Sequence, residues 1–216
     1  MLLELAVNRS ATVEDFETRR FAWIRCARVG NLITHSRSFN NPWYGLKEKT
    51  VTISFRISES AFKALQNDAK KNNTSLNTLA NQLFMAYADY DRFLQKFRMV
   101  KLSSPTFKRI LNAATKEAIV EAGRSAGSSV PESFIRARMG EINTASAVEY
   151  LRLMGAYANL FDYSEVTASG KSSVTLTHDL GENGSLFLAS YMDALFKSAG
   201  KDVKVAQYEN GITIDL

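Results

Sequence analysis

The chain has 216 residues, of which 45% are hydrophobic and 23% are charged, with a net charge of +5 and a pI near 9.3. These values are typical of a folded protein and exclude collagen-like and largely disordered chains, and the length suits one ordinary domain or two small ones. The longest stretch without a charged residue, 72–88, has only 17 residues and is rich in Asn, Thr and Ser. We therefore expect no membrane span and a cytoplasmic protein. The single cysteine, Cys26, cannot form an internal disulfide, as expected in a reducing compartment.

The charge is unevenly distributed along the chain. Residues 1–48 carry seven basic and five acidic side chains, residues 49–98 carry eight and four, and residues 99–216 carry twelve and thirteen. Residues 1–48 are interpreted as an N-terminal extension with one short helix followed by a Ser-, Asn- and Pro-containing loop. This arm either docks on the body of the protein or on a partner, or it is unstructured, and the sequence leaves these alternatives open.

The segment 50–57, TVTISFRI, alternates strictly between apolar and polar residues, which predicts a β-strand. Ser58 is suited to cap a helix over 59–71, and the pair Asn72-Asn73 ends it because Asn tolerates the left-handed conformation. Ser75 is suited to cap a second helix whose apolar residues keep a helical period as far as Phe97.

Residues 99–216 predict a second, mixed domain. The pattern predicts a short strand at 99–103, helices over 106–113, 115–126, 132–138, 144–160 and 184–199, and strands over 161–167, 172–178, 203–208 and 212–216. A Gly127-Ser128-Ser129 break with Pro131 separates the second helix from the third, and Asn210-Gly211 is a strong hairpin signal. Helices on one face of a small antiparallel sheet are expected, so the fold class is α+β.

A strand and two helices over 49–98 cannot bury a sufficient core alone. Two copies of strand 50–57 paired as an antiparallel ribbon would solve this problem, because their apolar faces would then rest on four helices. Such a ribbon presents Thr50, Thr52, Ser54 and Arg56 outward. A two-stranded ribbon fits the DNA major groove, where Arg pairs with guanine and Ser or Thr bonds several base edges.

The run TVTISFRISESAFKALQNDAKKNNTSLNTLANQLF resembles the ribbon-helix-helix DNA-binding domains of the Arc and methionine-repressor type. The resemblance covers under a quarter of the chain, and it implies an intertwined β-α-α dimer that regulates transcription, in most cases as a repressor. It further implies base reading by Thr52, Ser54 and Arg56. Phosphate binding is implied at the start of the second helix, at Thr74, Ser75, Leu76 and Asn77, where free N–H groups and the helix dipole also favour an anion. Lys49, Lys70 and Lys71 lie close enough in sequence to join this phosphate-facing surface.

The expected organisation is therefore an extension at 1–48, a ribbon-helix-helix domain at 49–98 and a sensing or oligomerisation domain at 99–216. The expected partners are double-stranded DNA and a second copy of the chain, as a dimer or a tetramer. Residues 99–216 are the candidate region for a small-molecule effector or a partner protein. Two alternatives stay open: an antitoxin-type interaction protein, and a metabolite-binding C-terminal domain whose ribbon serves only to dimerise it.

Other chemistries have weaker support. His35, His178 and Cys26 lie in separate segments without metal-ligand spacing, and no P-loop, dinucleotide fingerprint or nucleophile triad is recognisable, so we expect no metal, no cofactor and no enzyme. The motif THDLGENGS at 177–185 offers His178 and Asp179 either to a ligand or to a plain strand-to-helix turn. One set of apolar residues at helical spacing fits either a small-molecule cavity or the core: Met154, Tyr157, Phe161, Phe187, Tyr191, Met192 and Phe196.

Overall fold

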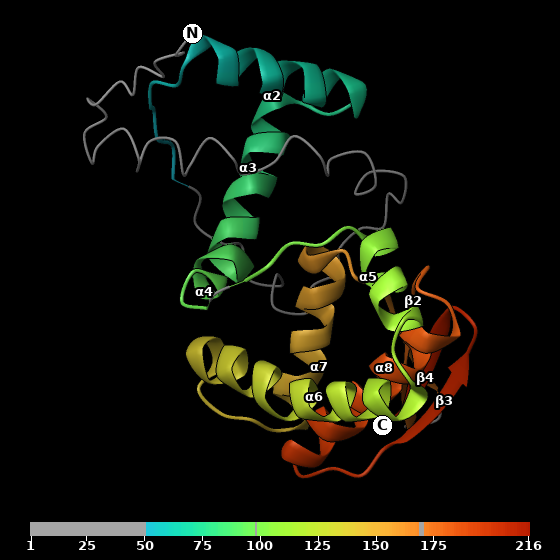
Figure 1. Ribbon diagram of the computed structural model, residues 1–216. Helices are drawn as coiled ribbons and strands as arrows, with labels where there is room; N and C mark the ends of the chain where they lie inside the picture. The colour runs from blue at the N-terminus through green and yellow to red at the C-terminus, as the bar shows by residue number, and fades with distance from the viewer. Residues whose placement is uncertain (1–50, 98, 169–170) are drawn as a thin grey trace, which may run out of the picture. The chain divides into compact units, whose positions relative to one another are not determined.

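The computed structural model describes residues 51–97, 99–168 and 171–216 (Figure 1). Contacts divide the chain into two compact units, Met1–Leu83 and Phe84–Leu216. We call them the N-terminal unit, described over 51–83, and the C-terminal unit. The predicted boundary at 98/99 differs from this division, because residues 84–97 pack with the C-terminal unit.

Helix α2, Glu59–Lys71, has the bounds predicted for it. At its start, the Ser58 Oγ accepts a hydrogen bond of 3.2 Å from the Ala61 N–H. The hydroxyl oxygen thus pairs one of the first-turn amides that have no acceptor within the helix. At its end, Asn73 takes a left-handed conformation with a φ of 49°. The sequence prediction of a Ser-capped helix ended by the Asn pair is confirmed.

The second predicted helix is a composite of three pieces. It consists of α3 (Leu76–Ala86), a π-helical turn η2 (Tyr87–Asp91) and a short α4 (Arg92–Leu94). A π turn is wider than an α turn and rotates the side chains that follow it around the helix axis. Here Tyr90 and Phe93, which are 5% and 8% exposed, both enter the core of the C-terminal unit. The departure from a regular helix thus occurs where these rings join the core.

The C-terminal unit combines helices with one sheet. After α4 come α5 (Ser104–Asn112), α6 (Lys116–Met139), α7 (Thr144–Leu153), the π turn η3 (Met154–Ala158) and α8 (Glu182–Ser198). The strands are β1 (Asp162–Ala168), β2 (Lys171–Thr177), β3 (Lys204–Tyr208) and β4 (Gly211–Asp215), in the antiparallel order β1-β2-β4-β3. The mixed α+β class and the closing hairpin are confirmed, whereas residues 99–103 form no strand.

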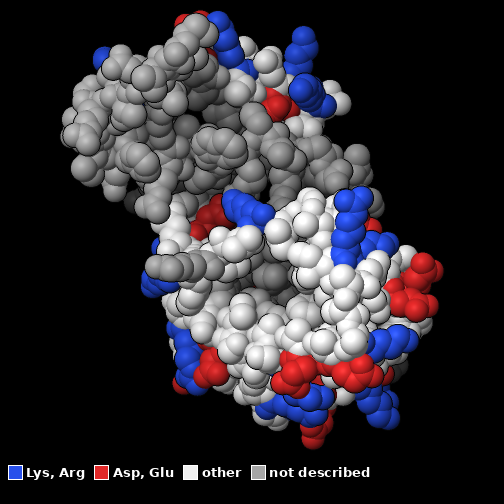
Figure 2. Space-filling view, viewed as in Figure 1, with Lys and Arg blue, Asp and Glu red and all other residues white. Residues whose placement is uncertain are grey.

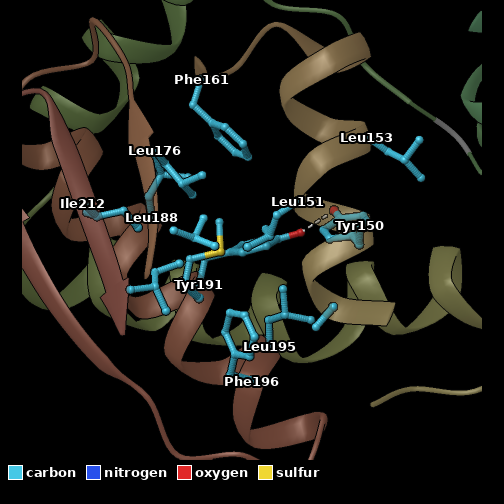
Figure 3. Packing of buried hydrophobic residues seen from close by; sticks show 14 of the residues in the cluster. Tyr150, Leu151, Leu153, Phe161, Leu176, Leu188, Tyr191, Leu195, Phe196 and Ile212 are labelled. Atoms are coloured by element: carbon cyan, nitrogen blue, oxygen red, sulfur yellow. Dashed lines mark hydrogen bonds between the residues drawn. The ribbon is translucent and has the colours of Figure 1, made fainter. Parts of the chain in front are cut away.

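One face of the sheet carries the core. Val174 and Leu176 of β2 pair with Ile214 and Ile212 of β4, and none of these four side chains is exposed. Helix α8 packs against both the sheet and α6 and contributes Leu188, Tyr191 and Leu195 to the same cluster (Figures 1 and 3). On the opposite face, the hydroxyls of Thr175 and Thr213 bond each other at 3.2 Å. The alternation of the two strands therefore separates a buried face from a polar one.

The predicted break at 127–131 is wrong, because α6 continues through it. Gly123 and Gly127 are buried against the backbone of α8, and a Cβ on Gly127 would lie 2.2 Å from the carbonyl oxygen of Tyr191. These glycines serve close helix packing instead of ending the helix. Pro131 also lies inside α6 and is buried. The contacts between α6 and α8 outweigh the local propensity of this segment to break.

Candidate functional site

The residues predicted to read DNA bases lie on an exposed segment. Thr52, Ser54 and Arg56 are all exposed, and within the described part of this chain 51–57 form no β ladder. The intervening apolar side chains are exposed as well, with exposed fractions of 77% for Val51, 67% for Ile53, 57% for Phe55 and 44% for Ile57. Four apolar side chains on alternate residues in water are unfavourable for an isolated chain. A strand at 51–57 that pairs with a second copy stays a prediction.

The helices that follow bury little. Within 51–83, only Ala69 and Leu79 are buried among the described residues. Phe62 of α2 and Leu83 of α3 are 39% and 41% exposed. Over 51–83, the described residues therefore contribute only a small apolar core, and much of the apolar surface of both helices is exposed.

The turn between α2 and α3 carries the residues that the sequence predicts to bind phosphate. The Ser75 Oγ accepts a hydrogen bond of 3.0 Å from the Thr78 N–H, so this amide is already paired. The N–H groups of Leu76 and Asn77, at the first two positions of α3, have no acceptor within the helix because of their place in its first turn.

Basic side chains precede this helix start in sequence. Lys70 and Lys71 are exposed in the last turn of α2. Thr74 is half-buried, and its N–H donates to the Ala69 carbonyl at 2.9 Å. The predicted phosphate residues of 70–77 thus lie at the end of α2, in the connection and at the start of α3, whereas Lys49 lies outside the described residues.

His178 is held in a closed hydrogen-bond network. Its ring is 8% exposed, and Nδ1 accepts a bond of 3.1 Å from the Leu180 N–H. This donor assigns the ring hydrogen to Nε2, which lies 3.1 Å from the Ser185 Oγ. Burial lowers the pKa of His178, with Lys108 acting in the same direction and Asp179 against it. The ring is therefore neutral at pH 7 and links the loop before α8 to the helix.

The remaining contacts of the motif are also structural. The Ser185 Oγ lies 3.3 Å from the carbonyl oxygen of Glu209, in the turn between β3 and β4, and 3.3 Å from that of Gly211, the first residue of β4. Since Nε2 is a donor, His178 is not placed to accept a proton from Ser185. Asp179 is exposed, and it is its carbonyl oxygen that accepts from Lys108 Nζ. These contacts fit the strand-to-helix turn better than a ligand pocket.

A cavity of about 460 Å³ lies in the C-terminal unit. It is lined mainly by apolar side chains of η2, α4, α6, α7 and α8. Figure 2 shows a hollow on the visible face of this unit surrounded by uncharged residues, with charged side chains toward the margin. Neither Lys, Arg, Asp, Glu nor His is among the described lining residues.

Five lining residues belong to the apolar set that the sequence spacing indicated. Met154, Phe161, Phe187, Tyr191 and Met192 line the cavity. The other two members of that set, Tyr157 and Phe196, pack with the core but are not in the lining. The contribution of α6, from Ser129, Val130, Ser133 and Phe134, was missed because the sequence places a helix break there. The helical spacing of apolar residues in α7 and α8 was the one sequence signal that indicated the position of this lining.

Two further structural results concern the described residues as a whole. They contain no group of three or more His, Cys, Asp or Glu side chains placed to hold a metal ion. In the same part of the chain, no helix has the length and apolar character needed to cross a membrane.

Comparison with protein families gives a match over the C-terminal part of the chain. A family model, AF_0136_C, described as a family C-terminal domain, matches residues 93–216. The matched region is more than half of the chain and contains α5 to α8 and the whole sheet. No curated protein and no solved structure matches the chain.

Proposed function

We propose that this chain, which belongs to the AF_0136_C family through its C-terminal domain, is a homodimeric, sequence-specific DNA-binding regulator of the ribbon-helix-helix type. The observation that carries the proposal is the exposed, alternating segment 51–57 followed at once by two capped helices. The match begins at residue 93, so the proposal rests on the N-terminal unit alone.

Dimerisation follows from the exposed apolar surface. Two copies of 51–57 paired antiparallel would place Val51, Ile53, Phe55 and Ile57 of both chains on one face of a ribbon. That face would rest on the apolar sides of α2 and α3, where Phe62 and Leu83 are exposed in the single chain. Removal of this surface from water is the driving force, at about 25 cal/mol per Å² of apolar area.

The polar face of the same ribbon would enter the DNA major groove. It carries two hydroxyl side chains, of Thr52 and Ser54, and one guanidinium, of Arg56. Short hydroxyl side chains bond several bases, so discrimination rests mainly on Arg56, whose bidentate pairing with guanine contributes about 1–3 kcal/mol. The free amides of Leu76 and Asn77 and the ammonium groups of Lys70 and Lys71 would hold phosphates on either side.

The dimer is tested first by measuring the molar mass of the full chain in solution. Ile53→Asp places a carboxylate on the apolar face and should give monomers, whereas Thr52→Asp, one residue away on the polar face, should remain dimeric. Equal masses for the two variants would contradict the alternation on which the ribbon depends.

The phosphate contacts are tested by the salt dependence of binding to a mixed-sequence duplex. Each phosphate contact contributes about 0.9 to the slope of log K against log salt concentration. Lys71→Ala should reduce the slope by about twice that value, since a dimer loses two contacts. Lys116→Ala, which removes an exposed lysine of α6, is the control and should leave the slope unchanged. Identical slopes for the two variants would remove Lys71 from the interface.

A further inference from the structure

Two buried tyrosines that line the cavity of the C-terminal unit form a polar pair in its wall. Tyr150 of α7 and Tyr191 of α8 both line it, and their side chains are 2% and 9% exposed. Their hydroxyl oxygens lie 2.8 Å apart and bond each other (Figure 3). Burial raises the pKa of both phenols, so each keeps its proton at neutral pH.

This pair has one more donor than it uses. Two phenols carry two O–H hydrogens, and one hydrogen bond between them consumes one. Among the described residues, the only hydrogen bond that involves either hydroxyl is the one that joins them. The second hydrogen therefore has no acceptor in the described part of the chain, in a place where an unsatisfied donor is costly. A ligand atom in the cavity is a natural acceptor for it.

The cavity is also flanked by two π-helical turns, which are rare and concentrate at functional sites. Tyr90 of η2 and Met154 of η3 both line the cavity, and the Tyr90 hydroxyl donates to the Met154 Sδ at 3.1 Å. The rings of Tyr90 and Tyr157, one from each turn, stack with centroids 5.8 Å apart. Both helices thus depart from the regular α form where they border the cavity.

Size and charge define the kind of ligand. A volume of about 460 Å³ lies in the range of small-molecule sites, roughly 300–1,000 Å³. The described lining carries no charged side chain, so a carboxylate or ammonium group would enter without a counter-charge, at a high desolvation cost. Aromatic and Met side chains form most of the wall and suit a flat or branched apolar body.

We propose that this cavity binds an uncharged, mainly apolar small molecule with one hydrogen-bond acceptor, such as a carbonyl, which accepts from the Tyr150–Tyr191 pair. Ser129, Val130 and Ser133 of α6 are exposed members of the lining, as is Met99, so the cavity is accessible from the surface at these residues. The hydroxyls of Ser129 and Ser133 donate to carbonyl oxygens of their own helix. They therefore offer no competing donor to the ligand. The inference does not depend on DNA binding.

The test uses three probes of one shape and the full chain in equilibrium dialysis. Acetylnaphthalene has a ketone, isopropenylnaphthalene replaces its oxygen by a methylene group, and naphthoate carries a negative charge. The ketone should bind saturably and about fivefold more tightly than the alkene, the value of one ordinary net hydrogen bond. Naphthoate should not bind. Equal affinities for ketone and alkene, saturable naphthoate binding or no binding of any probe would each overturn the proposal.

Variants locate the binding. Either tyrosine alone keeps one free O–H, so Tyr191→Phe should retain the preference for the ketone, whereas Tyr150→Phe combined with Tyr191→Phe should abolish it. Ser133→Phe should block the opening and cause loss of binding. Ser128→Phe is the matched control, since Ser128 is exposed on the same helix but is not in the lining. A ketone preference that survives the double substitution, or equal binding by the two serine variants, would refute the assignment.

Discussion

Replacement of Gly127 by Ala tests the close packing of α6 on α8. The added Cβ would lie 2.2 Å from the Tyr191 carbonyl oxygen and 2.8 Å from its carbonyl carbon, well inside contact distance. These are backbone atoms, so no side chain can rotate away and one helix must move. Overpacking of this kind costs about 1–3 kcal/mol, and a rigid obstacle favours the upper end.

An opposing contribution comes from helix propensity. Ala stabilises a helix interior by about 1 kcal/mol relative to Gly, so the net loss expected for Gly127→Ala is about 2 kcal/mol. With a slope of about 2 kcal/mol per M of urea, the midpoint of unfolding followed by circular dichroism should fall by about 1 M. Ser128→Ala, at the exposed neighbouring position, should change the free energy of unfolding by less than about 0.5 kcal/mol. A Gly127→Ala protein as stable as wild type would refute the packing argument.

Three other substitutions test individual contacts by urea unfolding. In the unfolded state His178 takes up a proton near pH 6.5, whereas its lowered pKa in the native state disfavours protonation of the ring. The free energy of unfolding should therefore fall as the pH drops below about 6.5. His178→Asn should lose most of this pH dependence. An unchanged slope would mean that another group titrates. Ser75→Ala should cost about 1 kcal/mol by removing the acceptor for the Thr78 N–H, and no loss would exclude the cap. Arg138→Lys should cost about 1 kcal/mol of unfolding free energy. The Arg138 guanidinium donates bonds of 2.8 and 3.0 Å to the carbonyl and carboxylate oxygens of Asp89, and an ammonium group cannot reproduce this pair. Full stability of this variant would count against the pairing.

Local signals predicted the elements whose structure depends on neighbours in sequence. Ser58 and Asn73 set the limits of α2, because caps are properties of a few consecutive residues. The hairpin indicated by Asn210-Gly211 also forms, with Glu209 and Asn210 connecting β3 to β4. The elements that the sequence did not predict depend on tertiary packing. Gly127 signals a break when considered alone, yet it lies inside α6 because only Gly allows α8 to approach so closely.

The candidate sites divide in the same way. Alternation at 51–57 and the caps of α2 and α3 are local patterns, so the residues proposed to face DNA could be selected from the sequence. The Tyr150–Tyr191 pair could not, since the two side chains are 41 residues apart and meet only when α7 packs near α8. The helical spacing indicated that Tyr191 lies on the apolar face of its helix. The same spacing does not show that one of two bonded phenol hydroxyls keeps an unused hydrogen.

The measurement that tests the central claim most directly is selection of binding sites by the full-length protein from a random duplex library. The account predicts enriched sequences with twofold symmetry, because a dimeric ribbon presents the same side chains to two half-sites. It also predicts that Arg56→Ala loses preference for guanine at one position of each half-site, whereas Arg109→Ala, an exposed arginine of α5, selects the wild-type sequence. Enrichment without symmetry, or the same sites selected by both variants, would contradict a ribbon that reads DNA through Arg56.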